Sequence, residues 1–399
     1  MSESFNFYLP TRIIFGKDKA DQLASMSLPG QKALIVTTSG GSIIRNGSLS
    51  RVEAALSIQG IEYVVFSEIS SNPDTTSIAK GAECARTNSC DFVIGLGGGS
   101  AIDAAKAIAV LTKNGNNFWD YIQRGSGGRK RPGNGALPII AIPTTAGTGT
   151  EADPWLVVSN HDTGEKIGCG WDFTYPTISI VDPSLMMSVP KNFTAMQGMD
   201  AFFHASEGYI ATCATPVSEM FSLQAISLLS RYLPAAVNNG SDDEARAKVA
   251  WASTAAGIVE SLSDTVSQHY VSHAITAYHE NVPHGAALIA LCVSYFSIFV
   301  DTIPEKLSIM ASAMGAGDNF ASPREGALCF IEALKNLIRD IGMADLDLKE
   351  YGVTMEEAPM IAHKAYETVR LLFGITPADI SEEQMTQIVK ESIGGHHYE

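Results

Sequence analysis

The segment Asp91-Phe-Val-Ile-Gly-Leu-Gly97-Gly98-Gly99-Ser100-Ala-Ile-Asp103-Ala-Ala-Lys106 decides the fold. An apolar run of strand length leads into three glycines, and an alanine-rich segment typical of a helix follows. Because glycines lack side chains, backbone N–H groups there can approach a phosphate, and the helix directs the positive end of its dipole at the same anion. A plain strand-to-helix turn needs only one glycine. The triple glycine therefore predicts a pyrophosphate site, although its spacing differs from the usual Gly-x-Gly-x-x-Gly fingerprint.

A second segment has the same design: Pro138-Ile-Ile-Ala-Ile-Pro143-Thr144-Thr145-Ala-Gly147-Thr148-Gly149-Thr150-Glu151. An apolar run again ends in a loop, this time rich in threonine and glycine. Threonine hydroxyls and exposed N–H groups suit ribose and phosphate oxygens without adding charge. Taken alone, a simple turn explains this loop equally well. Since loops at the carboxyl ends of parallel strands are where open sheets bind ligands, the second loop strengthens the prediction from the first.

Strand-like and helical segments alternate through the first half of the chain. Apolar runs occur at 33–36, 63–66, 92–94, 139–142 and 178–181, and amphipathic segments at 48–59 and 76–87 separate the first three. This alternation predicts an α/β domain with a doubly wound, Rossmann-like parallel sheet. After Pro183 and Pro190, long segments with helical period take over, so the second domain is expected to be all-α. We expect domains at 1–187 and 188–399, because 399 residues are too many for one core.

Composition excludes several classes of protein. The formal net charge of −16, from 27 basic and 43 acidic residues, disfavours nucleic acid or anionic lipid as the main partner. No apolar run is long enough to span a bilayer, and residues 1–16 do not resemble a signal peptide, so no membrane association is expected. The six cysteines include no Cys-x-x-Cys pair, which excludes a zinc ribbon and indicates reduced thiols in the cytoplasm. His396 and His397 are expected to lie in a frayed tail.

Histidines in the helical half form a pattern that indicates a metal site. Asp200 and His204 are four residues apart, as are His269 and His273, so each pair lies on one face of a helix. His284, between a proline and a glycine, adds an imidazole at a turn or helix start. A single buried histidine is more often a hydrogen-bonded core residue, but this many in an apolar region are costly unless they bind something. One carboxylate with three imidazoles suits Fe2+ or Zn2+, and spacing does not choose between them.

Four stretches together resemble the iron-containing (group III) alcohol dehydrogenases. They are Pro10-Thr-Arg-Ile-Ile-Phe-Gly16, the loops at 97–106 and 143–151, and the aspartate and histidines of the helical half. The resemblance runs along nearly the whole chain. It implies the dehydroquinate synthase-like architecture of that family, in which a dinucleotide-binding domain and a helical domain enclose a cleft for metal and nicotinamide.

The resemblance also implies roles for particular residues. Asp200, His204, His269 and His284 fall on the metal-ligand positions, and His273 falls on a catalytic histidine near the nicotinamide. The residues expected at the cofactor are Thr38, Gly97, Gly98, Gly99, Ser100, Asp103, Thr144, Thr145, Thr148, Lys166 and Leu185. The chain departs from the family pattern in two places. The spacing from His273 to His284 is one residue longer, which makes His279 another candidate ligand, and the unusual Trp155 is expected to shape the substrate pocket.

Cofactor preference depends on the end of the first long strand. NAD-preferring members of the family commonly carry an aspartate where this chain has Thr38, because that carboxylate accepts the ribose hydroxyls and repels a 2′-phosphate. Here hydroxyls and N–H groups replace the acid, and Arg45 is nearby in sequence. NADP is therefore tolerated on electrostatic grounds and is slightly favoured over NAD.

These features predict a metal-dependent, NAD(P)-linked oxidoreductase that interconverts a small primary alcohol and its aldehyde by hydride transfer, acting as an aldehyde reductase. Two alternatives stay open: a lyase or transhydrogenase of the same fold, and a nucleotide- and metal-binding protein without turnover. The lyase needs basic residues for an anionic substrate, and these are sparse around the predicted metal region. The expected partner is a small-molecule alcohol or aldehyde, bound to a cytoplasmic homo-oligomer, dimer or larger.

Overall fold

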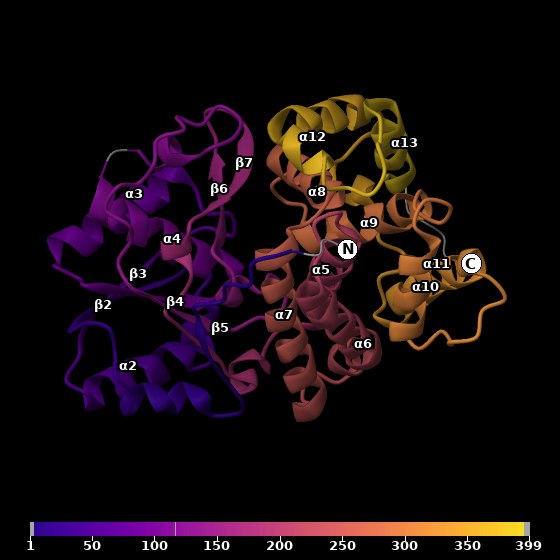
Figure 1. Cartoon of the computed structure of the whole chain (residues 1–399). Coiled ribbons are helices and arrows are strands. Elements are labelled where there is room, and N and C mark those ends of the chain that lie inside the picture. The colour runs from indigo at the N-terminus through magenta and orange to yellow at the C-terminus, as the bar shows by residue number, and fades with distance from the viewer. Residues whose placement is uncertain (1–3, 116, 395–399) are drawn as a thin grey trace. The chain divides into compact units, whose positions relative to one another are not determined.

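The computed structural model describes residues 4–115 and 117–394, so His396 and His397 lie outside the described residues. The chain divides into two compact units, which Figure 1 colours from indigo to yellow along the sequence. One comprises Leu9–Val189, and the other comprises the described residues from Pro190 onward with those before Leu9. The first unit is α/β and the second is helical. The assignment of nucleotide binding to domain 1–187 and of catalysis to domain 188–399 remains a prediction.

Six parallel strands form the main sheet of the first unit, in the order β1-β8-β5-β4-β2-β3. They are β1 (Arg12–Phe15), β2 (Lys32–Thr38), β3 (Glu62–Ile69), β4 (Phe92–Gly97), β5 (Ile139–Pro143) and β8 (Ile178–Val181). The predicted parallel sheet is confirmed, and each apolar run of the sequence lies within one of these strands. β4 is buried at every residue and lies between β5 and β2, so the triple glycine follows an interior strand.

Alternate residues of the strands enter two separate cores, one on each face of the sheet. In β2, Leu34 and Val36 belong to the core beneath α3 (Thr75–Thr87) and α4 (Gly99–Asn114). Ala33 and Ile35 belong to the core beneath α2 (Ser48–Ile58). Figure 1 shows α2 on one side of the strands, with α3 and α4 on the other. The remaining short elements are α1 (Ser42–Arg45), η1 (Lys19–Ala24), η2 (Phe118–Tyr121), η3 (Thr150–Ala152), η4 (Asp172–Thr174) and η5 (Pro183–Met186).

Two features of this unit are absent from the prediction. Strand β1 has only four residues and pairs on one side only, with β8. The other feature is an antiparallel hairpin of β6 (Trp155–Asn160) and β7 (Glu165–Gly170). Its inward residues Leu156, Val158 and Ile167 join the core on the α3 and α4 face.

Lys106 joins α4 to this hairpin through a buried network. Its side chain is fully buried, and Nζ contacts five oxygens. These are the Thr150 carbonyl and hydroxyl (both 2.7 Å), the Asp153 carbonyl (2.9 Å) and carboxylate (3.1 Å), and the Trp155 carbonyl (2.6 Å). One turn earlier on α4, Asp103 accepts hydrogen bonds from the Thr150 hydroxyl (2.8 Å) and the Val157 N–H (3.0 Å). An ammonium group can lie so far from water only because acceptors surround it.

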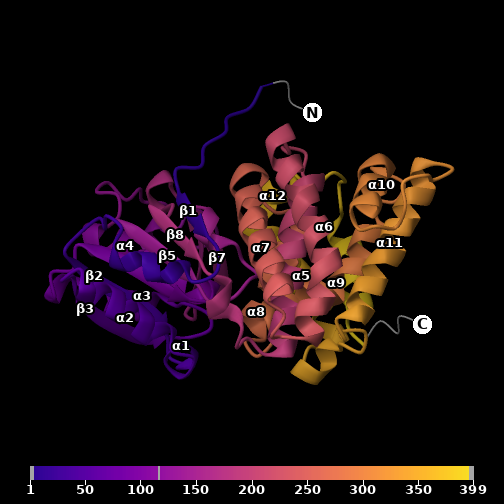
Figure 2. The ribbon, with the colours of Figure 1, turned by 90° about the horizontal axis from the view of Figure 1, so that it is seen from below.

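The described part of the second unit is built from α-helices and short 3-10 turns. The helices are α5 (Lys191–Ile210), α6 (Pro216–Asn238), α7 (Asp243–Ser263), α8 (Ser267–Tyr278), α9 (His284–Ser297), α10 (Pro304–Ala313), α11 (Pro323–Asp340), α12 (Ala358–Phe373) and α13 (Glu382–Ser392), with η6 (Leu348–Tyr351) and η7 (Met355–Glu357). Helix α5 is buried at every residue from Gly198 to Ile210. It packs against α6, α7 and α9, and Figure 2 shows it among them. The predicted helical second half is confirmed.

A glycine sets the close approach of α9 to α5. A Cβ atom on Gly285 would lie 2.2 Å from the Met196 carbonyl oxygen, so any other residue would force the two helices apart. Gly285 follows His284, the first residue of α9. The close packing therefore fixes the position of His284 relative to α5.

None of the helices in the described part of the chain is long and apolar enough to cross a lipid bilayer.

The buried lysine network predicts a large loss of stability on substitution. Replacing Lys106 with methionine keeps the length of the side chain but leaves the Asp153 carboxylate buried without its partner. We expect the free energy of unfolding to fall by about 3–5 kcal/mol. Urea unfolding followed by tryptophan fluorescence measures this, since Trp119, Trp155 and Trp171 all lie in the first unit.

Lys80 offers a matched control, because its ion pair with Glu68 (3.4 Å) is exposed on both sides. Replacing Lys80 with methionine should change the free energy of unfolding by only about 0–1 kcal/mol. Equal effects of K106M and K80M would contradict a stabilising role for the buried network.

Candidate functional site

Helix α5 presents three functional side chains on one face. Asp200, His204 and Glu207 are separated by four and three residues, which brings them together along the helix surface. All three are buried, and the Glu207 side chain is fully enclosed. Polar side chains at such positions need partners from neighbouring helices.

Helices α8 and α9 supply the imidazoles that face Asp200. The Oδ1 atom of Asp200 lies 3.5 Å from His284 Nε2 and 3.6 Å from His269 Nε2. One ligand atom from each of Asp200, His269 and His284 lies within 4.8 Å of the others, an arrangement that could hold a metal ion. His204 flanks this group, with its Nδ1 3.9 Å from the same carboxylate oxygen and its ring centroid 4.4 Å from that of His269. The structure thus brings together all four residues that the sequence singles out as ligands.

Each of these three histidines has a second partner on the side of the ring away from Asp200. Glu207 Oε1 lies 2.6 Å from His269 Nδ1, and Ser272 Oγ lies 2.8 Å from His284 Nδ1. Glu260 Oε2, on α7, lies 3.6 Å from His204 Nε2. Outer partners that hydrogen-bond to an imidazole help to orient its ring.

Negative charge dominates the electrostatics of this cluster. Burial disfavours the charged imidazole of His269, but the negative charges of Glu207 and Asp200 outweigh burial and raise its pKa to about 10. Burial also raises the pKa of Glu207, against the opposing effect of His269. A positive charge, whether a proton or a metal cation, is therefore favoured here.

The donor set fits a divalent cation. Asp200 Oδ1 and His269 Nε2 are both buried, and neither has a hydrogen-bond partner among the described residues. Buried polar atoms without partners are rare in proteins because each costs about 1–3 kcal/mol. A metal ion would satisfy both atoms at once. Carboxylate oxygen and imidazole nitrogen are donors that both Fe2+ and Zn2+ accept.

The two remaining histidine candidates lie in different surroundings. His273 is half-buried, and its ring centroid lies 5.0 Å from that of His284 and 5.9 Å from that of Tyr270. His279, at the end of α8, instead directs its Nε2 to Glu357 at 3.2 Å. The structure therefore places His273 beside the cluster and pairs His279 with a carboxylate of η7.

In the first unit, the two loops that the sequence singles out touch one another. The Thr144 N–H donates to the Gly97 carbonyl (2.8 Å). A Cβ atom on Gly99 would lie 2.5 Å from Thr148 Cγ2, and one on Gly98 would lie 3.2 Å from Thr145 Oγ1. Gly97 also has φ 151°, which L side chains rarely adopt. These glycines are thus needed for the loops to pack, and they place the backbone of 97–100 beside the threonine hydroxyls.

The other residues predicted at the cofactor are more dispersed within the first unit. Ser100 Oγ donates to the Ser71 carbonyl, and Lys166 Nζ donates to the Asn72 side chain (3.1 Å), so both reach the segment after β3. Thr38 ends β2 and is half-buried. Asp103 and Leu185 face the interior: Asp103 has both carboxylate oxygens bonded to the hairpin region, and Leu185 lies in the core on the α2 face.

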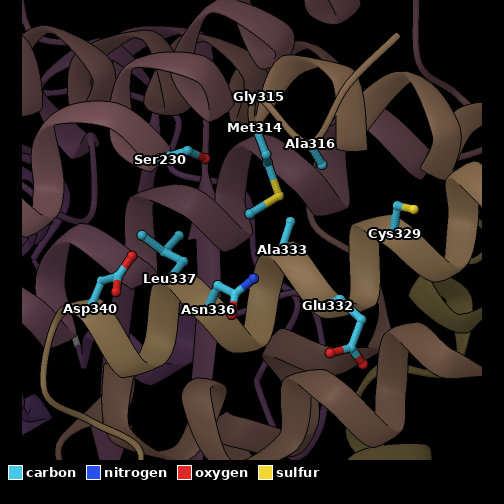
Figure 3. Close-up of a pocket in the computed structure, with 10 residues that line it drawn as sticks. All are labelled: Ser230, Met314, Gly315, Ala316, Cys329, Glu332, Ala333, Asn336, Leu337 and Asp340. Carbon is cyan, nitrogen blue, oxygen red and sulfur yellow. The ribbon is translucent and has the colours of Figure 1, made fainter. Parts of the chain in front are cut away.

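A separate pocket of about 380 Å3 lies in the helical unit between α6, the end of α10 and α11 (Figure 3). Four polar or sulfur-bearing side chains, Cys329, Glu332, Asn336 and Asp340, line it from α11. Glu332 is paired with Lys335 (2.7 Å). None of the histidines or predicted cofactor residues lines this pocket.

Sequence reasoning missed the outer partners Glu207, Ser272 and Glu260. For Glu207 the signal was present, because it lies three residues after His204 on the same helical face. Ser272 likewise lies three residues after His269. Glu260 is on α7, and only the packing of α7 against α5 brings it to His204.

Comparison with known proteins covers both units. The family described as iron-containing alcohol dehydrogenase matches residues 10–183, and its C-terminal counterpart, described as the Fe-containing alcohol dehydrogenase family, C-terminal, matches residues 194–393. The NAD-dependent methanol dehydrogenase of Bacillus methanolicus is 30% identical over 401 residues, covering 97% of this chain and 100% of the relative. The 1,3-propanediol dehydrogenase of Citrobacter freundii is 31% identical, covering 97% and 98%.

A solved structure resembles the chain along its length. An archaeal halo-thermophilic alcohol dehydrogenase from a Red Sea brine pool superposes with a TM-score of 0.93 and 32% identity. The match covers 98% of this chain and 100% of the other. Both units therefore have counterparts in one and the same relative.

The geometry predicts which histidines retain a metal. After anaerobic reconstitution with Fe2+ or Zn2+ and desalting, we expect the unmodified chain to hold about one metal per chain. His269→Ala and Asp200→Ala should each lower the metal content to near zero. Each removes one of the three candidate ligand atoms that lie within 4.8 Å of one another. Elemental analysis of the desalted protein measures the content.

His279→Ala is the control for this experiment, since its imidazole is paired with Glu357. It should retain the metal. Loss of metal from H279A, together with retention by H269A, would show that His279 and not His269 is the metal ligand.

Proposed function

The chain belongs to the iron-containing alcohol dehydrogenase family, and on that premise we propose that it is a metal-dependent, NAD(P)-linked enzyme that reduces a small aldehyde to its primary alcohol. It is an alcohol and aldehyde oxidoreductase, as its relatives are. The observation that carries the proposal is the buried pair of unsatisfied atoms, Asp200 Oδ1 and His269 Nε2, with His284 beside them. The interconversion of a short aliphatic alcohol and its aldehyde is supported by the methanol and 1,3-propanediol named for two relatives.

Membership of the family implies a divalent metal, typically iron, and NAD(H). We propose that Asp200, His204, His269 and His284 hold one Fe2+ or Zn2+. When bound, the metal supplies Lewis-acid polarisation of the substrate oxygen. Asp200 contributes one negative charge to balance the cation, and the outer partners of the histidines keep the rings in place.

We propose that the nucleotide is held by the first unit. Backbone N–H groups of residues 97–100, at the start of α4, suit the pyrophosphate, and Thr144, Thr145 and Thr148 offer hydroxyls beside them. Lys166 adds a cation on β7. The bound cofactor supplies the hydride. Asp103 and Leu185, which lie inside the unit, are proposed to act by shaping these loops.

We infer that NADP is accepted and slightly favoured. Residues 37–47, from the end of β2 through α1, contain no acidic residue. Arg45 Nη1 would lie 3.2 Å from a Cβ atom on Gly41, so a cation faces the turn after β2. A 2′-phosphate at this turn would meet hydroxyls and a guanidinium rather than a carboxylate.

His273 is proposed to move the proton that the alcohol oxygen gains or loses. Its imidazole lies beside His284, and histidine exchanges protons near neutral pH.

The proposal also includes a homo-oligomer in the cytoplasm, supported by the family resemblance and by six cysteines that are all free thiols.

The test of the proposed reaction is the reduction of a panel of small aldehydes by metal-reconstituted protein, followed by the absorbance of NADPH or NADH. We expect steady turnover with at least one short aldehyde. His273→Ala should lower kcat by about a hundredfold while its metal content stays unchanged. If no aldehyde is reduced although metal is bound, the chain is a binding protein instead; unchanged turnover in H273A would remove His273 from the reaction.

Cofactor preference is tested by placing a carboxylate at the end of β2. In the unmodified chain, kcat/KM for NADPH should equal or exceed that for NADH. Thr38→Asp should shift the ratio toward NADH by about tenfold or more, a change of about 1.4 kcal/mol, because the carboxylate would repel the 2′-phosphate.

Thr38→Asn is the matched control, because it has the size of aspartate without the charge. It should leave the ratio nearly unchanged. A strong preference of the unmodified chain for NADH, or equal shifts in T38D and T38N, would contradict the electrostatic account.

A further inference from the structure

The carboxylate of Glu207 is enclosed between two nitrogen atoms from the start of one helix. Its Oε2 accepts from the Val266 N–H at 3.0 Å, and its Oε1 lies 2.6 Å from His269 Nδ1. Val266 immediately precedes α8, and His269 lies in its first turn. Glu207 is fully buried, so water does not compete for either oxygen.

This arrangement restricts where His269 carries its proton. A backbone N–H can only donate, and an ionised carboxylate can only accept. Both oxygens of ionised Glu207 therefore act as acceptors, which requires a proton on His269 Nδ1. When the ring is neutral, its lone pair must then be on Nε2, the atom that faces Asp200 Oδ1 at 3.6 Å.

We propose that Glu207 is a positioning residue that fixes the Nδ1–H tautomer of neutral His269, so that the lone pair is on Nε2, the atom that faces Asp200. This inference rests on the proposed metal-binding function. It adds a residue that touches neither metal nor substrate and acts only through His269. Because a carboxylate can accept from the Val266 N–H and from His269 Nδ1 at the same time, it suits this position.

The other two outer partners do not impose such a restriction. The Ser272 hydroxyl lies 2.8 Å from His284 Nδ1 and 3.3 Å from the His284 carbonyl, and its single proton can point to either atom, so it does not fix the tautomer as a carboxylate does. Glu260 Oε2 lies 3.6 Å from His204 Nε2, which is too long for a hydrogen bond. Of these three partners, Glu207 is the one whose chemistry selects a single tautomer.

The substitution Glu207→Gln tests the inference because it changes the charge and one acceptor without changing the size. An amide offers one acceptor and one donor group. If its oxygen faces the Val266 N–H, its NH2 group faces His269 Nδ1 and favours the tautomer with the proton on Nε2. If the amide is turned around, its NH2 group faces the Val266 N–H, so two buried donors lie opposite each other. Either orientation should weaken metal binding, by about 10–100-fold.

The readout is the affinity of the full-length, metal-free protein for Zn2+, measured by competition with a chromophoric chelator. Ser272→Ala is the matched control, since it removes a hydrogen bond to a ligand histidine without selecting a tautomer. We expect its affinity to fall by less than about tenfold. Thermal unfolding of both metal-free variants shows whether each is folded.

A spectroscopic measurement keeps the inference testable even if E207Q does not fold. In unmodified protein loaded with Zn2+ and labelled with 15N-histidine, His269 should show a hydrogen-bonded Nδ1–H proton, with Nε2 bound to the metal. The His269 resonance is assigned through its connection to the backbone resonances of the same residue, so the metal site stays intact. In folded E207Q the Nδ1–H signal should shift or disappear.

The outcomes separate the two proposals. If the unmodified chain binds no Zn2+, the proposed metal function fails and the inference fails with it. If the unmodified chain binds Zn2+ but E207Q binds it equally tightly, or if His269 binds through Nδ1, the inference about Glu207 is overturned while the metal function stands.

Discussion

A buried carboxylate that faces three imidazole rings is the interaction on which the helical unit depends. Asp200 Oδ1 lies 3.5–3.9 Å from a ring nitrogen of His284, His269 and His204, and these residues come from α9, α8 and α5. Removing a carboxylate from water costs several kcal/mol unless positive charge compensates. Without a metal, a proton on His269 can supply that charge, because Glu207 and Asp200 raise the pKa of this buried imidazole. With a metal, the cation takes that role, so the packing of three helices and the binding of the ion are coupled.

The two units use different chemistry for recognition. In the first unit, backbone N–H groups and threonine hydroxyls gather at the carboxyl ends of β4 and β5, and the glycines between them permit contacts that any Cβ atom would block. The one fully buried cation described there, Lys106, donates its hydrogen bonds to carbonyl and carboxylate oxygens of the protein itself. In the second unit, ionisable side chains form the site. Neutral donors suit a large anion, and a compact group of acid and imidazole suits a small cation.

The sequence predicts those parts of the fold that depend on hydrophobic periodicity and composition. Each of the five apolar runs became a strand of the parallel sheet, because buried parallel strands are continuous in hydrophobicity. Strand β1 was not predicted, because its apolar run of three residues does not by itself distinguish a short edge strand from a loop. The β6–β7 hairpin was missed too. The hydrogen-bond partners of the Asp103 carboxylate, the Thr150 hydroxyl and the Val157 N–H, lie before and within this hairpin and were missed with it. The i, i+4 spacings indicated the histidine cluster, whereas Glu260 depends on the packing of α7, which no local pattern records.

The start of α9 has a consequence for how this centre accommodates changes in chain length. On α5, inserting one residue between Asp200 and Glu207 would rotate every later side chain by about 100° and scatter the group. The connection between α8 and α9, residues 279–283, has no such repeat. His284 is located instead by the contact of Gly285 with the Met196 carbonyl, whatever the length of the preceding turn. A residue added between His273 and His284 would therefore be absorbed in this turn. Changes in the length of this turn would then leave the imidazole in place, as long as Gly285 keeps its contact with Met196.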